Sequence, residues 1–160
     1  MRKTLSTAVA VVVLALAAPA PAADSSPLTD GKAFYEKECA VCHTLERSLA
    51  VQADRASWEG TIAKMVAKGA KLEKTQIEPI LGYLTAKSAF ETKCNTCHDL
   101  QRPLKAIKDP EQWKATVLRM AAMKPGQISD ADAGAITLYL SLVTPAKAAA
   151  PPAPAAPGYK

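Results

Sequence analysis

Apolar residues recur at helical spacing along the chain, and no segment shows the alternation of apolar and polar residues that predicts a strand. One stripe at positions i, i+4 and i+7 occurs twice: Trp58, Ile62 and Met65, then Trp113, Val117 and Met120. A further apolar helix is expected after each stripe, over residues 77–84 and 136–140. The pattern therefore predicts an all-α protein.

Polar residues that favour the first turn of a helix precede several of these segments. Asp109 and Pro110 combine an N-cap with proline at the first helical position, and Asp54 holds the matching place before the earlier stripe. Ser129 with Asp132 is expected to cap the last helix. These residues predict where three of the helices begin.

Two more helices are predicted to lead into the cysteine pairs. Thr29 or Asp30 is expected to cap a helix that runs to Cys42, and residues 88–91 form a capping-box pattern that would open its counterpart. Almost no linker separates that counterpart from the helix over residues 77–84. The two helices are therefore expected to run nearly into one another.

The chain repeats itself with a shift of 55 residues. The related pairs are Tyr35 and Phe90, Cys39 and Cys94, Cys42 and Cys97, His43 and His98, Asp54 and Asp109, Trp58 and Trp113, and Met65 and Met120; one extra residue then aligns Tyr83 with Tyr139. Two copies indicate a duplicated module and not a solenoid. We place the units at residues 23–86 and 87–145.

Both ends of the chain are expected to lie outside these units. Residues 1–22 combine a basic start, an apolar run and a small-residue cleavage signal, which predicts a cleaved signal peptide and export to the periplasm. The run is shorter than the ~20 residues that span a bilayer, so no stable transmembrane segment is expected after cleavage, and an uncleaved anchor is the alternative. The Ala- and Pro-rich tail, residues 146–160, is expected to be disordered.

The charge of the chain argues against a nucleic-acid partner. The formal net charge is +5, and removal of Arg2 and Lys3 leaves 18 Lys and Arg against 15 Asp and Glu, which is +3. No basic run stands out, and aromatic residues make up only 5% of the chain. We therefore expect no binding of nucleic acid.

Each unit contains a C-x-x-C-H motif, which is the signature of covalent c-type haem attachment. The two thiols are spaced to form thioethers with the two vinyl groups of one porphyrin, and the following His can bind the iron. An enclosed haem would also add the apolar mass that a unit of ~55 residues lacks. Two haem c groups are therefore predicted on these residues: Cys39, Cys42, His43, Cys94, Cys97 and His98.

Three other uses of the four cysteines remain open. A redox-active disulfide of the thioredoxin type needs a βαβ setting, and no strand is predicted. A four-thiolate zinc site would leave the two histidines without a role. Disulfides within each C-x-x-C would close loops too small to stabilise the fold appreciably.

Methionine is the expected sixth ligand, because the two histidines of the chain are both assigned to the proximal side. Met65 is the one candidate in the first unit, and Met120 is its repeat equivalent. Met123 is the alternative to Met120, because residues 123–126 resemble the loop that supplies this ligand in small class I cytochromes c, whereas the corresponding stretch 67–71 contains no Met. The competing interpretation is that methionines in such a stripe fill the core.

The units resemble small class I cytochromes c. Gly31 and Tyr35 resemble the N-terminal helix of that family, where a glycine and an aromatic residue meet the last helix; Ala86 and Phe90 hold these places in the second unit. The order of Trp, Met and final helix is similar to cytochromes associated with sulfite and amine dehydrogenases. The resemblance implies two tandem cytochrome c-like units of about 55 residues, each wrapped round one haem.

Supporting roles are expected for several other side chains. Trp58 and Trp113 are predicted to pack beside the haems, with an indole N–H able to reach a propionate, or simply to fill the core. The remaining aromatic residues are interpreted as helix-packing residues: Tyr35, Tyr83, Phe90 and Tyr139. Five lysines are candidates to surround the haem edges and attract an acidic partner: Lys32, Lys64, Lys68, Lys105 and Lys124.

The expected function is a relay of single electrons between redox partner proteins such as a dehydrogenase or an oxidase. The protein would act as a free shuttle or as a dehydrogenase subunit, and it would transform no substrate, so it is not expected to be an enzyme. One alternative is a dihaem peroxidase-like enzyme, which needs an open iron face. The other is a haem sensor in which one Met ligand is labile.

Overall fold

The computed structural model describes residues 27–146, so the predicted signal peptide and residues 147–160 of the tail lie outside the described part of the chain. Within this range the protein is all-α, as predicted, and it has seven helices and no strand. The helices are α1 (Pro27–Cys39), α2 (Glu46–Leu49), α3 (Arg55–Ala67), α4 (Lys74–Cys94), α5 (Gln101–Leu104), α6 (Pro110–Met123) and α7 (Asp130–Val143). None of the described helices is long and apolar enough to cross a membrane.

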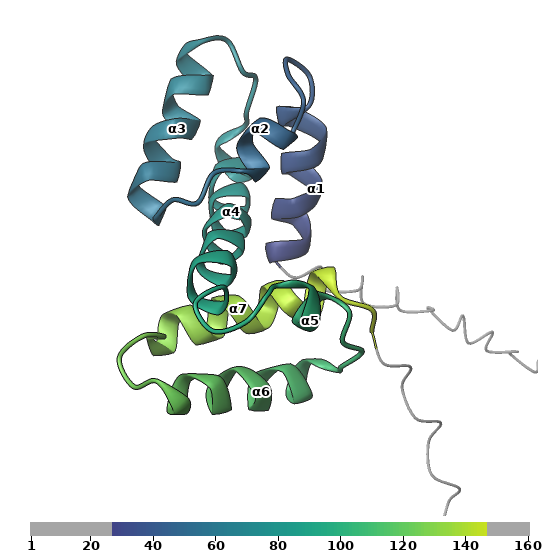
Figure 1. Cartoon of the computed structure of the whole chain (residues 1–160). Helices are drawn as coiled ribbons and strands as arrows, with labels where there is room; N and C mark the ends of the chain where they lie inside the picture. The colour runs from purple at the N-terminus through teal and green to yellow at the C-terminus, as the bar shows by residue number, and fades with distance from the viewer. Residues whose placement is uncertain (1–26, 147–160) are drawn as a thin grey trace, which may run out of the picture.

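Helix α4 forms the axis of the molecule (Figure 1). Helices α1, α2 and α3 surround its first part, and α5, α6 and α7 lie at its other end. Helix α4 packs against α1, α3 and α7, and α6 packs against α7. One 21-residue helix therefore joins both halves of the fold.

The order of helices in the first half is repeated in the second. Helices α2 and α5 begin at positions 46 and 101, and α3 and α6 begin at 55 and 110, so each pair differs by 55 residues. Helices α4 and α7 begin at 74 and 130, a difference of 56 that matches the extra residue in the sequence repeat. The sequence repeat is thus also a repeat of secondary structure.

Three predicted helix starts are confirmed. Asp54 and Asp109 accept the backbone N–H groups three residues ahead, at Ser57 and Gln112, each over 2.8 Å. Ser129 accepts the N–H of Asp132 over 3.1 Å. Each side chain satisfies a backbone donor that the first turn leaves free, a contribution of about 1 kcal/mol to stability.

Two other predicted boundaries are wrong. Helix α1 is already formed at Pro27 and ends at Cys39, so Thr29 and Asp30 lie inside it and residues 40–42 form a turn. Ser88 does not open a helix, because it lies in the interior of α4. Buried residues at positions 84, 86, 88 and 90 hold this stretch against its neighbours, so α4 continues through the unit boundary expected at 86–87.

Aromatic rings fill the contacts between α1, α4 and α7. The ring centroids of Tyr35 and Tyr83 are 5.6 Å apart, and those of Phe90 and Tyr139 are 5.4 Å apart at the corresponding place in the second half. Tyr83 and Tyr139 link the two pairs over 6.0 Å. Their interpretation as helix-packing residues is therefore confirmed.

Gly31 allows α1 to approach α4 closely. A Cβ atom at this position would lie 2.0 Å from the carbonyl oxygen of Pro79 and 3.1 Å from Cβ of Tyr83. Such distances are far inside van der Waals contact, so a larger residue would push the helices apart. In the second half the matching position is Ala86, which is buried in α4.

Candidate functional site

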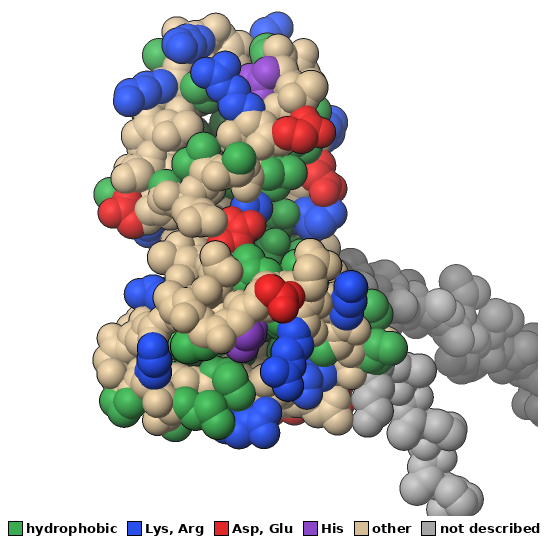
Figure 2. Space-filling model, viewed as in Figure 1, with side chains coloured by type: hydrophobic (Ala, Val, Ile, Leu, Met, Phe, Trp, Pro, Cys, Tyr) green, Lys and Arg blue, Asp and Glu red, His purple; other side chains and the backbone are tan. Residues whose placement is uncertain are grey.

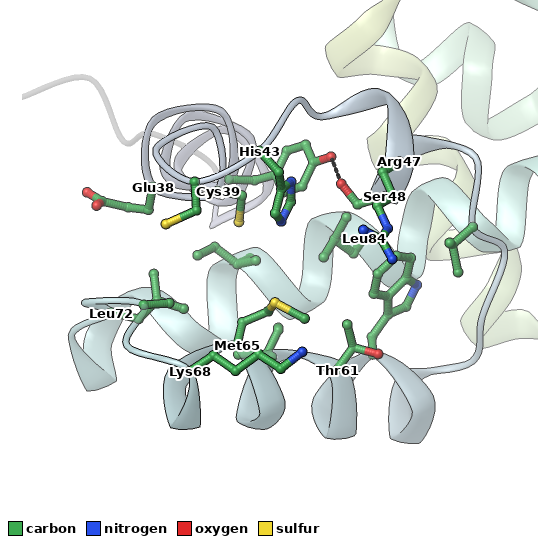
Figure 3. A pocket seen from close by; sticks show the side chains of 17 residues that line it. Glu38, Cys39, His43, Arg47, Ser48, Thr61, Met65, Lys68, Leu72 and Leu84 are labelled. Atoms are coloured by element: carbon green, nitrogen blue, oxygen red, sulfur yellow. Dashed lines mark hydrogen bonds between the residues drawn. The ribbon is translucent and has the colours of Figure 1, made fainter.

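The first candidate site is a cavity of about 410 Å³ between α1, α3 and α4. Cys39, Cys42 and His43 line one side of it, and Met65 of α3 lines the other. Figure 3 shows Met65 and His43 pointing toward one another across the space, with the sulfur of Cys39 beside the imidazole. The structure therefore brings together all four site residues that the sequence predicted for the first unit.

The second candidate site is a larger cavity, of about 640 Å³, in the second half. Cys94, Cys97 and His98 line it, and α6 contributes both methionine candidates, Met120 and Met123. Met120 is half-buried, whereas the side chain of Met123 is 68% exposed. Both alternatives from the sequence thus reach the cavity, and Met120 is the better enclosed.

The two C-x-x-C-H motifs have the same local structure. The first Cys of each is the last residue of a helix, α1 or α4, and the next three residues form a turn. Nδ1 of His43 lies 2.9 Å from the carbonyl oxygen of Thr44, and Nδ1 of His98 lies 3.0 Å from that of Asp99. Because a carbonyl can only accept, Nδ1 carries the proton and donates, which leaves Nε2 of each neutral imidazole free to bind a metal.

The four cysteines are free and lie in two separate pairs, one in each cavity. Burial, aided by the charge of Glu38, raises the pKa of the Cys39 thiol. Burial and the neighbouring Cys97 raise the pKa of Cys94 to about 11. A redox-active C-x-x-C has a thiol with a lowered pKa, so these two thiols differ from that class of site.

Among residues 27–146, no group of three or more His, Cys, Asp and Glu side chains is placed to hold a metal ion. Each cavity instead offers one imidazole nitrogen together with sulfur atoms of Cys and Met. Soft sulfur donors with imidazole suit iron that a porphyrin already holds through its own nitrogens. Both cavities also fall within the ~300–1,000 Å³ typical of cofactor sites. The residues present therefore fit a covalently attached haem in each half.

The two tryptophans line the cavities, but their N–H groups already have acceptors inside the protein. Nε1 of Trp58 donates to Oγ of Ser88, and Nε1 of Trp113 donates to Oγ1 of Thr144, each over 2.9 Å. Both indoles are almost fully buried. These contacts differ from the expected bond to a propionate, and they make each Trp a fixed wall of its cavity.

The sequence pattern did not predict Ser88 and Thr144 as partners of the tryptophans. The two residues are 56 positions apart, the same shift that relates Tyr83 to Tyr139. The repeat therefore contained the signal, but the capping pattern at residues 88–91 gave Ser88 another interpretation.

A buried lysine also supports the first cavity. Lys87 of α4 is 4% exposed and donates to the carbonyl oxygen of Leu49 over 2.6 Å. Its charge is balanced by Glu91, one turn further along the helix, at 2.6 Å. Leu49 is the last residue of α2, and Arg47 and Ser48 of the same helix line the cavity. The Lys87 contact therefore anchors this wall to α4.

A different contact supports the second cavity. Gln127, in the loop between α6 and α7, donates to the carbonyl oxygen of Lys93 over 3.3 Å and also to Oγ1 of Thr96. Thr96 lies between Cys94 and Cys97 in the second motif. The loop that follows the two methionines is therefore tied directly to the turn of the second C-x-x-C-H motif.

The charges on the two cavities differ strongly. The first is lined by Glu38, Arg47 and Lys68, which sum to +1. Among residues 27–146, five cations and no carboxylate line the second: Lys93, Arg102, Lys108, Arg119 and Lys124. Of the lysines expected around the haem edges, Lys68 and Lys124 line a cavity, while Lys32 pairs with Glu36 over 2.6 Å. The other two, Lys64 and Lys105, are not among the lining residues.

Comparisons of this chain with models of known protein families, with curated proteins and with solved structures find no match.

Proposed function

We propose that this chain is an exported dihaem c-type cytochrome that relays single electrons between redox partner proteins, either free or as the cytochrome subunit of a dehydrogenase. When bound, each haem would supply an iron that alternates between Fe(II) and Fe(III). The observation that carries the proposal is the joint placement, in each half, of a C-x-x-C-H motif and a methionine around one cavity.

The residues of the chain would have simple roles in this function. The cysteines would tether the porphyrin through thioethers, and Nε2 of His43 and of His98 would bind the iron from one side. Met65 and Met120 would bind from the other side and raise the reduction potential. Buried walls such as Trp58 and Trp113 would keep water from the site.

In this proposal the molecule consists of two cytochrome c-like units that share α4. The first unit would comprise α1, α2, α3 and the first part of α4, and the second unit would comprise the rest of α4 with α5, α6 and α7. Support comes from the repeated helix order and from the two matching aromatic contacts. An iron held on both faces has no open position for a substrate, so the protein would not be an enzyme.

The second cavity supports one alternative, a haem sensor with a labile methionine. It is the larger cavity, and Met123 on its wall is mostly exposed. Carbon monoxide binding to the reduced, folded protein would favour the sensor alternative, because carbon monoxide can bind only when a ligand leaves the iron. A high-spin spectrum of the resting protein would instead favour the peroxidase-like alternative.

The test is the intact mass of protein matured in a haem-competent periplasm, together with the reduced pyridine spectrum. We expect the mass of the processed polypeptide plus two haems, and a spectrum of the thioether-linked type. Replacing Cys39 and Cys42 by Ala should remove one haem, and the matched change at Cys94 and Cys97 should remove the other. A mass equal to that of the bare polypeptide would refute the proposal.

A further inference from the structure

The two cavities offer very different surroundings to a partner. We define the basic rim as the five cations that line the second cavity: Lys93, Arg102, Lys108, Arg119 and Lys124. Figure 2 shows Lys and Arg side chains around the histidine of the lower half, with one acidic side chain beside it. The asymmetry is local, since residues 27–86 carry 8 basic and 8 acidic side chains and residues 87–146 carry 8 and 6.

Most of the basic rim is not neutralised within the protein. Lys93 lies 3.6 Å from Asp132, and Nζ of Lys108 lies 5.6 Å from the ring centroid of Trp113. Arg102, Arg119 and Lys124 are exposed and form no ion pair with another described residue. These three charges are therefore available to an outside partner.

Asp99, the carboxylate residue that directly follows the second motif, is used locally. Oδ1 of Asp99 accepts the backbone N–H groups of Gln101, over 2.9 Å, and Arg102, over 3.3 Å. Its oxygen thus accepts two backbone donors at the start of α5, and Asp99 is not among the residues that line the cavity. The first cavity differs, because Glu38 is itself part of the wall.

The second cavity also has apolar lining residues in addition to its basic rim. Met123 lines the cavity and is 68% exposed, and Pro103, Ala106 and Ile128 line it too. An apolar centre inside a polar rim is the usual anatomy of a protein–protein interface. A small inorganic anion would use the charges alone, whereas a protein would use both features.

The charge difference survives occupation by haem. If the proposed function holds, each haem adds two propionate carboxylates, so the lining charge becomes +1 − 2 = −1 at the first cavity and +5 − 2 = +3 at the second. We infer that the mouth of the second cavity is the docking surface for an acidic redox partner protein, and that the first cavity does not share this role. Electron exchange with such a partner would then pass through the second half.

The test compares two variants of the haem-loaded protein that each change the net charge by −4. The first is Arg119→Glu with Lys124→Glu at the second cavity, and the matched control is Arg47→Glu with Lys68→Glu at the first. An acidic plastocyanin serves as the protein probe, and the second-order rate of electron exchange is measured by stopped flow. We expect at least a tenfold loss at low ionic strength for the first variant, since steering changes association rates by ~10–10³.

The control variant should lose clearly less, and the difference between the two should shrink as salt is added, because the Debye length is ~10 Å at 0.1 M. Equal losses in the two variants would mean that net charge alone governs association, and would overturn the inference. No loss in either variant would overturn it as well.

Other occupants give distinct results. A dimer that forms with rising concentration and disappears in Arg119→Glu with Lys124→Glu would assign this face to a second copy of the chain. Stronger retention on phosphatidylglycerol vesicles than on immobilised plastocyanin would assign it to a membrane surface. Either result would overturn the inference of an acidic protein partner.

A failure of this inference is distinguishable from a failure of the proposed function. A protein that holds no haem shows no redox spectrum before mixing, whatever its surface charge. The docking surface can still be mapped in that case by amide line broadening with hexacyanochromate(III), an anionic paramagnetic probe. Broadening centred on residues 102–124 supports the surface, and equal broadening around Arg47 and Lys68 contradicts it.

Discussion

The two halves of the molecule share their interior and differ at the mouths of their cavities. Trp58 with Ser88 and Trp113 with Thr144 form the same buried hydrogen bond, and the aromatic contacts between helices repeat within 0.2 Å, at 5.6 and 5.4 Å. The two cavities differ in the charge of their lining residues and in the number of methionines. The Gln127 hydrogen bond to the second motif also belongs to one half alone among residues 27–146. The comparison indicates that packing fixes what both halves need, while surface residues are free to give each half its own task.

The methionines provide the strongest test of this comparison. If the proposed function holds, Met65→Ala should convert the first haem from low to high spin and lower its potential, because no second Met of the described residues lines that cavity. Met120→Ala should do the same at the second haem, and Met123→Ala is the matched control that should leave the spectrum unchanged. Optical spectra and a redox titration of each variant give the answer.

An unchanged spectrum in Met65→Ala would remove the ligand assignment in the first half. A change in Met123→Ala, with none in Met120→Ala, would show that the two halves differ even in their iron ligand.

The close contact of α1 with α4 at Gly31 distinguishes the two halves, and a measurement of stability can test it. Gly31→Ala places a Cβ atom 2.0 Å from the carbonyl oxygen of Pro79, and the backbone there cannot yield without moving α1. We expect the free energy of unfolding to fall by ~1–3 kcal/mol, the usual cost of overpacking. The reverse change at the matching position, Ala86→Gly, should cost ~1 kcal/mol through helix propensity. Urea unfolding followed by circular dichroism measures both, and an unaltered midpoint for Gly31→Ala would contradict the close contact.

The hydroxyl partners of the tryptophans test the buried hydrogen bond that the two halves share. Ser88→Ala and Thr144→Val each leave a buried indole N–H without an acceptor, which costs ~1–3 kcal/mol. Each change also removes a second hydrogen bond, because Ser88 Oγ accepts the backbone N–H of Ala53 over 3.3 Å and Thr144 Oγ1 donates to the carbonyl oxygen of Leu140 over 2.6 Å, so losses of similar size are expected. Thr144→Ser keeps the hydroxyl and should retain most of the stability. Equal stability of Thr144→Val and the unchanged protein would argue against the buried bond.

Loss of the Gln127 hydrogen bonds in the second half should have a smaller, local effect on stability. Gln127→Ala removes the bonds to Lys93 and Thr96, so we expect a loss of ~0.5–1.5 kcal/mol confined to this region. Amide hydrogen exchange should become faster in residues 93–97 and hardly change elsewhere. Lys71→Ala alters the corresponding residue of the first half and is the control. Faster exchange at residues 38–42 in that control would mean that the tie is not specific to the second half.

The smallest expected effect is a pH-dependent contribution of Asp132 to stability. Burial raises the pKa of Asp132, but hydrogen bonds from Ser129 and the charge of Lys93 outweigh it, so the pKa is lowered overall. A lowered pKa stabilises the folded state above the unfolded value of ~3.9, and this contribution is lost as the pH falls through the folded value. Asp132→Asn should therefore be less stable than the unchanged protein at pH 7 and equally stable once both pKa values are passed.

Thermal unfolding at a series of pH values measures this difference. Gln76 is the neutral residue at the matching place in the first half, so the effect of Gln76→Ala should not follow the same pH dependence. A difference for Asp132→Asn that persists unchanged to low pH would contradict the role of the charge.

The fold was predictable where short-range signals decide it. Asp54, Asp109 and Ser129 cap their helices through contacts within three residues, which the sequence displays directly. The start expected at Ser88 failed, because both side chains of its capping pattern have other partners. Trp58 takes the Ser88 hydroxyl and Lys87 takes the Glu91 carboxylate, so neither side chain is left to cap a helix.

The site was predictable to the same extent. The motif residues and Met65 could be grouped by their repeat positions, and the structure gathers them around one cavity. Of the basic rim only Lys124 was predicted, since the members are spread over residues 93–124 and line one cavity only where α6 packs against α7. The tautomer of His43 likewise depends on the carbonyl of Thr44, a backbone contact that has no sequence signature.

The continuity of α4 has a consequence for how the chain matures. Trp58 and Leu49 find their partners at Ser88 and Lys87, and Lys87 needs Glu91 for its charge. A polypeptide made from its N-terminus therefore cannot finish the first half before residue 91 is synthesised, three positions ahead of Cys94. The first half is therefore not a complete intermediate while residues 87–91 are missing, whereas the second half waits for Thr144, the partner of Trp113.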